Sequence, residues 1–512
     1  MRLQQIVASV ACLAVLGSAL GAHPAPASAK QTHKPHPAAA PMADEHNSVT
    51  HGTVTVGGQS IAYTATTGNL ILKDKKGKPA VSVFYVAYTK DGADRSQRPV
   101  TFLYNGGPGC ASSPLHMFAF GPRRIEVANA KPNSGPPFKL INNGDSLLDK
   151  SDLIFIDAPG TGYSKLLPGA DPKDFYGIDQ DAAAFAQFIE RYVTLNDRWN
   201  SPKFLLGESY GTPRSAALVD YLQNNDNMQF NGVILLSSVL DFDTIAPGPG
   251  NDLAYITYLP TEAAVRWYHD TSSNKGSLQA TIDAARSFAN GPYASALLQG
   301  NRLSHDQFVK IAGEFARMTG LSQTYVEQSN LRVQPGRFEK ELLRAEGKQT
   351  GRLDARYTGY DLDQIGDSAE YDAADADVSN ALQSQFISYA HNTLHYTNDA
   401  HYPQCVGPVN QNWDYTRKSI FGWLAPTTSP DLQEAMTTNP NLRVFVGGGY
   451  FDMATPFGAA EWTFSHLGLQ PALQSHVQMH FYDSGHMVYL NPNALAQFHG
   501  DLDHFYDSVL SH

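Results

Sequence analysis

A sharp turn from a buried strand into a helix is predicted at residues 205–211, which read Leu-Leu-Gly-Glu-Ser-Tyr-Gly. Apolar residues precede the turn, and a helix pattern follows it at 215–222. The glycines permit a tight turn, which lifts the hydroxyl of Ser209 clear of the strand end. This is the context of a G-x-S-x-G nucleophile elbow, so Ser209 is the candidate nucleophile of a sheet protein flanked by helices.

Strand and helix patterns alternate around this turn. Short runs rich in β-branched and aromatic residues predict strands at 81–88, 100–104, 152–157, 203–206 and 233–236. Apolar residues recur at helical spacing along 179–193, which predicts a helix between two of these strands. Such alternation favours the α/β class, with a mostly parallel central sheet and helices on both faces.

The pattern changes in the middle of the chain. The length of 512 residues alone suggests about three domains, but helical patterns dominate only from 241 to 440, and strands return at 442–446 and 477–482. An amphipathic helix is expected at 492–510. We therefore expect one catalytic domain, residues 49–240 and 441–512, that is interrupted by a large helical insertion or lid at 241–440.

The first 29 residues have the pattern of an export signal. A positive start is followed by an apolar run at 6–20, too short for a membrane span of about 20 residues, and Ala27-Ser28-Ala29 offers a cleavage site. We expect export to the periplasm or the extracellular space, with no stable membrane insertion after removal of residues 1–29; an uncleaved anchor is the alternative. Residues 30–48, rich in Pro, Ala and His, are expected to be a disordered lead-in rather than a metal site.

Charge and cysteine content exclude several classes of protein. The formal net charge of −12 argues against a nucleic-acid partner held by electrostatics. Three cysteines are too few for a disulfide-rich scaffold or a multi-cysteine zinc protein. Cys12 lies in the apolar run of the signal, which leaves Cys110 and Cys405. In an exported protein these two can form a disulfide or remain free thiols.

A serine nucleophile needs a base and a group that orients the base. In α/β-hydrolases these follow in the order Ser, Asp or Glu, His, each after a strand. His486 follows the strand at 477–482 and fits the base. Asp452 follows the strand at 442–446 and is favoured as the acid over Asp483, which lies on the same loop as His486.

Backbone amides and a second carboxyl complete the candidate site. One oxyanion donor is expected from the N–H of Tyr210, and the other from the glycine-rich loop after the strand at 100–104. Glu208 lies beside the nucleophile, where a charged carboxylate would oppose an anionic intermediate. Together with Asn105, a protonated Glu208 could instead hold a substrate carboxylate, and burial would raise its pKa accordingly.

Four ordered motifs resemble those of the serine carboxypeptidase family. They begin at Asn105, Asp157, Gly207 and Gly485 and read NGGPGC, DAPGTGYS, GESYG and GHM. A fifth stretch, GRLDAR at 351–356, is similar to bacterial members. The resemblance implies an α/β-hydrolase fold with a helical insertion over the site, and hydrolysis of C-terminal peptide bonds.

The resemblance also implies a role for each matching residue. These roles are the triad Ser209, Asp452 and His486, the oxyanion donors Gly107 and Tyr210, the substrate-carboxylate group Asn105, Gly106 and Glu208, and a half-cystine at Cys110 that favours pairing with Cys405.

One departure from the family pattern affects specificity. Many members carry a second glutamate fourteen residues after the motif asparagine, where this chain has Ala119. We therefore expect an exported serine carboxypeptidase that acts on peptides or proteins without metal or cofactor. An esterase, amidase or acyltransferase with the same site is the alternative, and a non-catalytic binding protein on a hydrolase fold is a third.

Overall fold

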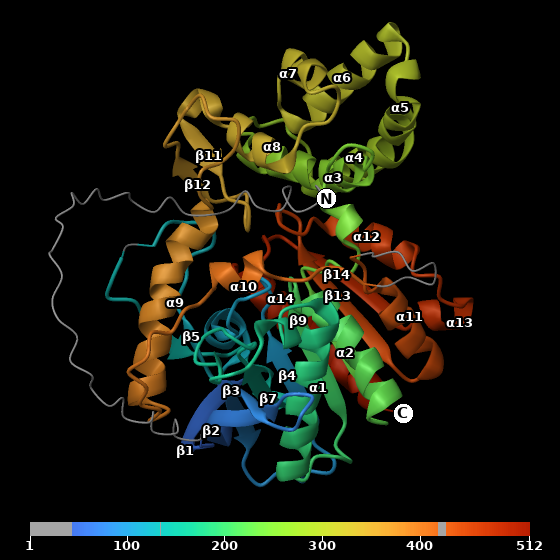
Figure 1. Ribbon diagram of the computed structural model, residues 1–512. Helices are drawn as coiled ribbons and strands as arrows, with labels where there is room; N and C mark the ends of the chain where they lie inside the picture. Colours follow the sequence, from blue (N-terminus) through green and yellow to red (C-terminus); the bar gives the residue numbers. More distant parts are fainter. Residues whose placement is uncertain (1–43, 134, 418–425, 512) are drawn as a thin grey trace, which may run out of the picture.

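The computed structural model describes residues 44–133, 135–417 and 426–511 (Figure 1). The expected signal segment and most of the expected lead-in lie outside the described residues. Strand β1 begins at Asn47, slightly before the end predicted for the lead-in. No helix within the described ranges is long and apolar enough to cross a membrane.

A 10-stranded mixed sheet forms the centre of the described chain, in the order β1-β2-β3-β7-β4-β9-β10-β13-β14, with β8 paired to β3. From β7 to β14 the neighbours are parallel, whereas β1, β2, β3 and β8 pair antiparallel. The parallel strands are β4 (Val100–Tyr104), β7 (Asp152–Ile156), β9 (Lys203–Glu208), β10 (Gly232–Leu236), β13 (Arg443–Gly449) and β14 (Val477–Tyr482). The antiparallel ones are β1 (Asn47–Val56), β2 (Gln59–Lys73), β3 (Pro79–Lys90) and β8 (Lys165–Leu166).

This topology confirms the predicted α/β fold. Every residue of β4, β7 and β10 is buried, because helices cover both faces of the parallel part and apolar side chains are needed on both. The first two strands were not anticipated. They extend the sheet on the antiparallel side of β3, whose strand was predicted at 81–88.

Helices pack on both faces of the sheet. One face is covered by α1 (Ile178–Leu195), α2 (Gly211–Asn225) and α11 (Ser429–Thr438). The other is covered by α14 (Pro492–Leu510) and α9 (Ala373–Asn392). Helix α14 has the bounds predicted from its periodicity. Smaller elements are α10 (Gly407–Gln411), α12 (Phe457–Ser465), α13 (Pro471–Gln474), β5 (Arg123–Ile125) and β6 (Leu140–Asn142).

The middle of the chain contains two kinds of structure. Figure 1 shows α3 to α8 gathered beyond one end of the sheet, and they share a separate apolar core. By contrast, α9 and α11 contribute apolar side chains to the two cores of the sheet. The boundaries of the lid, 241 and 440, remain a prediction. The packing favours a shorter lid, which comprises α3 to α8 and excludes α9 and α11. The elements of this region are α3 (Leu253–His269), α4 (Leu278–Phe288), α5 (Ala294–Gln299), α6 (His305–Thr319), α7 (Gln323–Gln328), α8 (Pro335–Glu341), β11 (Lys348–Thr350) and β12 (Thr358–Tyr360).

A disulfide joins Cys110 to Cys405 across a sequence separation of 295 residues. Backbone hydrogen bonds flank it, because Ala111 N donates to Gln404 O (2.7 Å) and Val406 N donates to Gly109 O (2.8 Å). The glycine-rich loop after β4 is therefore attached to the segment between α9 and α10.

Candidate active site

Ser209 lies at the turn between β9 and α2, as the G-x-S-x-G pattern predicts. Its φ of 60° is unusual for a residue other than glycine, and its N–H donates to Leu236 O at 3.0 Å. Close packing requires the flanking glycines, since a Cβ at Gly207 would lie 2.1 Å from Gly211 O. The hydroxyl-bearing residue is partly exposed, whereas both of its neighbours are buried.

Asp452 and His486 meet at the ends of β13 and β14. Asp452 Oδ2 lies 2.8 Å from His486 Nδ1 and also accepts from Thr455 Oγ1 at 2.7 Å. The other oxygen of Asp452 accepts from the N–H groups of Ala454 (2.8 Å) and Thr455 (2.9 Å). Asp483, the alternative acid, is exposed and does not contact the imidazole. The tertiary structure thus brings Asp452 to the base.

The surroundings of His486 adjust its basicity. Burial acts to lower the pKa of His486, but the charge and hydrogen bond of Asp452, with Glu208 nearby, raise it above its ordinary value. Among the described side chains, no hydrogen bond joins Ser209 Oγ to His486 Nε2. This contact commonly tightens only when substrate is bound.

The glycine-rich loop packs directly against the elbow. A Cβ at Gly106 would lie 2.3 Å from Tyr210 N, so only glycine permits this approach. Gly107 has a φ of 106°. The N–H groups of Gly107 and Tyr210 donate to no acceptor within the described residues, which leaves both free for a developing oxyanion.

Glu208 is buried beside the elbow and interacts with Asn105. Asn105 Nδ2 donates to Glu208 Oε1 at 2.9 Å. Burial raises the pKa of Glu208 to about 7, although His486, Tyr489 and Asn105 oppose this rise. Glu208 Oε2 and the Tyr489 hydroxyl are both buried and near one another, and neither has another hydrogen-bond partner in the described part of the chain. The carboxyl can therefore be protonated near neutral pH.

Position 119 carries no ionisable group. Ala119 is fully buried in a π-helical turn, Leu115–Phe120, and its carbonyl accepts from Asn143 Nδ2 at 2.6 Å. Glu208 therefore has no carboxyl neighbour from this segment.

Two residues of the site were not anticipated from the sequence. Thr455 bridges Asp452 and His486, and Tyr489 lies next to Glu208. Each follows a predicted triad residue by three positions. This closeness in sequence was the one feature from which their place in the site could have been predicted.

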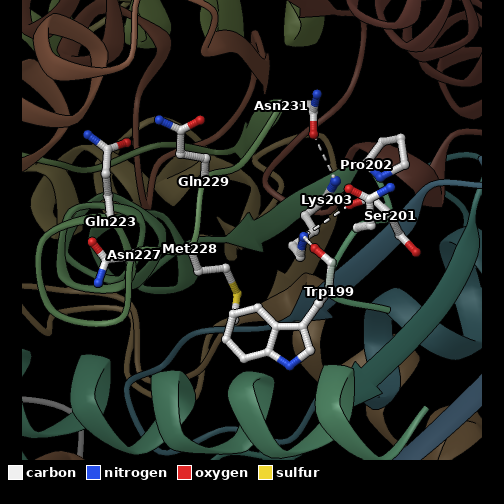
Figure 2. A pocket seen from close by; sticks show the side chains of 10 residues that line it. Trp199, Ser201, Pro202, Lys203, Gln223, Asn227, Met228, Gln229 and Asn231 are labelled. Atoms are coloured by element: carbon white, nitrogen blue, oxygen red, sulfur yellow. Dashed lines mark hydrogen bonds between the residues drawn. The ribbon is translucent and has the colours of Figure 1, made fainter. Parts of the chain in front are cut away.

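Other polar features lie apart from this site. A hollow of about 440 Å³ is found at the amino ends of β9 and β10, where Lys203, Asn231 and Trp199 line it (Figure 2). Ser209 lies at the opposite end of β9. A group of possible metal ligands, Asp149, His499 and Asp503, has ligand atoms within 4.8 Å of one another. Its carboxylates raise the pKa of His499 against the effect of burial, so an ion-paired imidazole accounts for the group.

The parallel sheet, the strand-to-helix elbow and the three side chains that follow β9, β13 and β14 define an α/β-hydrolase. The sequence profile of the serine carboxypeptidase family matches residues 59–493. The chain therefore belongs to the serine carboxypeptidase family, which confirms the resemblance seen in its motifs.

Curated relatives share shorter stretches with this chain. The pheromone-processing carboxypeptidase KEX1 of Cryptococcus gattii is 28% identical over 177 residues, which cover 34% of this chain and 25% of the relative. Its counterpart in Saccharomyces cerevisiae is 32% identical over 145 residues, covering 27% and 19%. The serine carboxypeptidase ctsa-3.2 of Caenorhabditis elegans is 26% identical over 183 residues, covering 33% and 30%. The chain thus spans less than a third of the length of each of these relatives.

Solved structures give distant matches. Proline iminopeptidase from Mycobacterium smegmatis matches with a TM-score of 0.36 at 14% identity, covering 90% of this chain and 99% of that one. The peroxisomal α/β-hydrolase Lpx1 from Saccharomyces cerevisiae matches with a TM-score of 0.31 at 10% identity, covering 92% and 90%. With scores this low, the fold assignment rests on the sheet topology and on the family profile.

Proposed function

We propose that this protein is an exported serine carboxypeptidase. Ser209 attacks the carbonyl of the C-terminal peptide bond while His486 accepts its proton, and Asp452 orients the imidazole. The N–H groups of Gly107 and Tyr210 hold the oxyanion. His486 then protonates the leaving amine, and water releases the acyl group from Ser209. The observation that carries this proposal is the buried 2.8 Å contact of Asp452 with His486, on strand ends next to the elbow.

We further propose that Asn105, Gly106 and Glu208 bind the substrate's free carboxylate. A protonated Glu208 can donate a hydrogen bond to it, and Asn105 already contacts Glu208 at 2.9 Å. Export is supported by the N-terminal signal pattern and by the disulfide, which persists in oxidising compartments.

The test compares three substrates that differ only at the C-terminus: a blocked dipeptide with a free carboxylate, its amide and its methyl ester. A carboxypeptidase should hydrolyse the free acid with the highest kcat/KM. Equal turnover of all three would contradict the assignment. Labelling of Ser209 by a fluorophosphonate, lost in Ser209→Ala, tests the nucleophile separately.

An esterase, amidase or acyltransferase with the same triad is the second candidate. It is favoured by Ala119, because Glu208 then has no carboxyl neighbour from the segment Leu115–Phe120. Faster turnover of the ester than of the free acid, or transfer of the acyl group to an added amine, would support this candidate.

A further inference from the structure

A short segment of the middle region contacts both loops that carry the acid and the base. Residues 351–356 read GRLDAR, the stretch that the proposed mechanism does not use. Leu353 O accepts from His486 N at 2.6 Å, and Arg352 O accepts from Met453 N at 3.0 Å. These two bonds place the backbone of Arg352 next to the loops of Asp452 and His486.

A buried ion pair holds the same segment in place. Arg356 Nη2 lies 2.6 Å from Asp354 Oδ2, and both side chains are 2% exposed. Arg356 Nη1 also donates to Asp483 O at 2.9 Å. A Cβ at Gly485 would lie 2.4 Å from Asp354 Cβ, so the segment and the His486 loop are in close contact. These contacts fix the backbone of Arg352 relative to the His486 loop.

The side chain of Arg352 has a different environment from that of Arg356. It is exposed, and it makes no hydrogen bond and no salt bridge with any described residue. Its backbone lies against the loops of Asp452 and His486, and its positive charge acts to lower the pKa of His486. An exposed cation that starts from this backbone position, without an ion-pair partner among the described residues, is available to bind an anion.

The acidic neighbours of Arg352 among the described residues form no ion pair with it. The carboxyl of Asp372 is buried and accepts from Leu353 N (2.8 Å) and Ala374 N (2.9 Å). Burial raises the pKa of Glu339 to about 8, so this side chain is largely uncharged at neutral pH. Arg352 can therefore take a substrate carboxylate as its direct ion-pair partner.

We propose that Arg352 is a specificity-determining residue that binds a carboxylate of the substrate's C-terminal residue, which leaves as the amine product. This inference rests on the proposed function. Arginine stays charged at all relevant pH values, and its planar fork matches a carboxylate. Arg352 would thereby supply a positively charged donor at every relevant pH, whereas Glu208, without a carboxyl partner at Ala119, is a neutral donor only when it is protonated.

The first experiment measures substrate preference in Arg352→Gln. Substrates are blocked dipeptides ending in leucine or glutamate, each as free acid and as C-terminal amide. For a free acid we expect kcat/KM to fall roughly 10- to 100-fold, mainly through KM, the size of a lost charge-assisted hydrogen bond. The leucine amide should change less than about threefold, and Arg352→Lys should retain part of the preference.

Matched controls and substrate arms make the outcomes distinct. Arg302→Gln removes another exposed arginine of the middle region. It should change kcat/KM neither for the free acids nor for the amides. Similar losses for both free acids assign the ligand as the α-carboxylate, whereas a loss confined to peptides ending in glutamate assigns it as the side-chain carboxylate. Equal losses for free acids and the leucine amide, or no loss, would overturn the proposal.

The second experiment is independent of turnover. Calorimetry on Ser209→Ala protein measures binding of a blocked dipeptide acid and of its amide. When Arg352→Gln is combined with Ser209→Ala, binding of the dipeptide acid should weaken, whereas binding of the amide should not change. If the wild-type protein hydrolyses none of the substrates and is not labelled by a fluorophosphonate, the proposed function fails. If it is active but Arg352→Gln leaves acid binding unchanged, only the role of Arg352 fails.

Discussion

At the scale of single residues, the environment of each ionisable group decides its protonation. Asp452 is fully buried, and its oxygens accept from two N–H groups, from the Thr455 hydroxyl and from His486. These donors fix the position of the carboxylate, and its contact with the imidazole raises the pKa of His486. Glu208 is equally buried but has fewer donors, so burial dominates and favours its neutral form.

Replacing Asp452 tests its role as the partner of His486. Asp452→Asn keeps the shape of the side chain but removes its charge and disturbs the imidazole tautomer. We expect kcat on a blocked peptide to fall by roughly 10³- to 10⁴-fold. Asp483→Asn, three residues from His486 and exposed, is the matched control and should retain nearly full activity. The reverse ranking would make Asp483 the acid.

The pH dependence of activity tests the environment of Glu208. Glu208 has a pKa of about 7 and must be protonated to donate to a substrate carboxylate. For free-acid peptides kcat/KM should therefore fall as pH rises above about 7, whereas the amide should lack this limb. Both substrates should lose activity toward acid pH as His486 becomes protonated.

Glu208→Gln separates this effect from other titrations. The amide side chain can donate a hydrogen bond at every pH, so the alkaline limb of the free-acid profile should flatten. An unchanged profile would contradict the role of Glu208.

At the scale of elements, a buried ion pair connects the helices on either side of the elbow. Asp181 of α1 contacts Arg214 of α2 at 2.6 Å, and neither side chain is exposed. Arg214 Nη1 also donates to Asn105 O at 2.8 Å, and its guanidinium lies 4.3 Å from the ring centre of Phe185. The pair therefore positions α2 against both α1 and the glycine-rich loop.

Breaking this pair should destabilise the fold. Asp181→Asn leaves the charge of Arg214 buried without a counter-ion, which costs about 3–5 kcal/mol in the free energy of unfolding. Urea denaturation measures the loss. Glu314→Gln is the control, because its 3.8 Å contact with Arg317 is exposed and contributes no more than about 1 kcal/mol. Similar values for the two variants would rule out a structural role for the buried pair.

At the scale of the whole molecule, the disulfide connects parts of the chain that are distant in sequence. It holds the loop of Gly106 and Gly107 to the segment that follows α9, across 295 residues. Helix α9 packs on the sheet and is hydrogen-bonded to this segment, because Gln383 Nε2 donates to Tyr402 O and Gln404 Nε2 donates to Ser379 O, both at 2.9 Å.

Removal of the bond should affect stability and activity together. Cys405→Ser is expected to lower the free energy of unfolding by about 2–5 kcal/mol, because the unfolded chain loses a long-range constraint. The melting temperature should fall equally when the wild type is reduced, and the variant should not respond to reductant. We expect kcat/KM to decrease for acid and amide substrates alike, since the oxyanion loop is shared. A variant as stable as the wild type would contradict this account.

Local patterns in the sequence were sufficient for several features. Strand–turn–helix at Ser209 and the helix of α14 depend on hydrogen bonds and side-chain periodicity over a few residues, so they can be recognised without tertiary information. The motif order likewise indicated the family. The roles of Ser209, Asp452 and His486 remain predictions for the experiments above.

Other features depended on contacts between distant segments. Sequence alone favoured Asp452 over Asp483 as the acid, and the pairing of β13 with β14 places Asp452 against the imidazole. Other features also depend on long-range contacts. They are the β1–β2 edge, the packing of α9 on the sheet, the position of Tyr489 beside Glu208, and that of the Arg352 backbone beside the His486 loop. Each depends on which strand ends and helix faces become neighbours, and local periodicity contains no information about that arrangement.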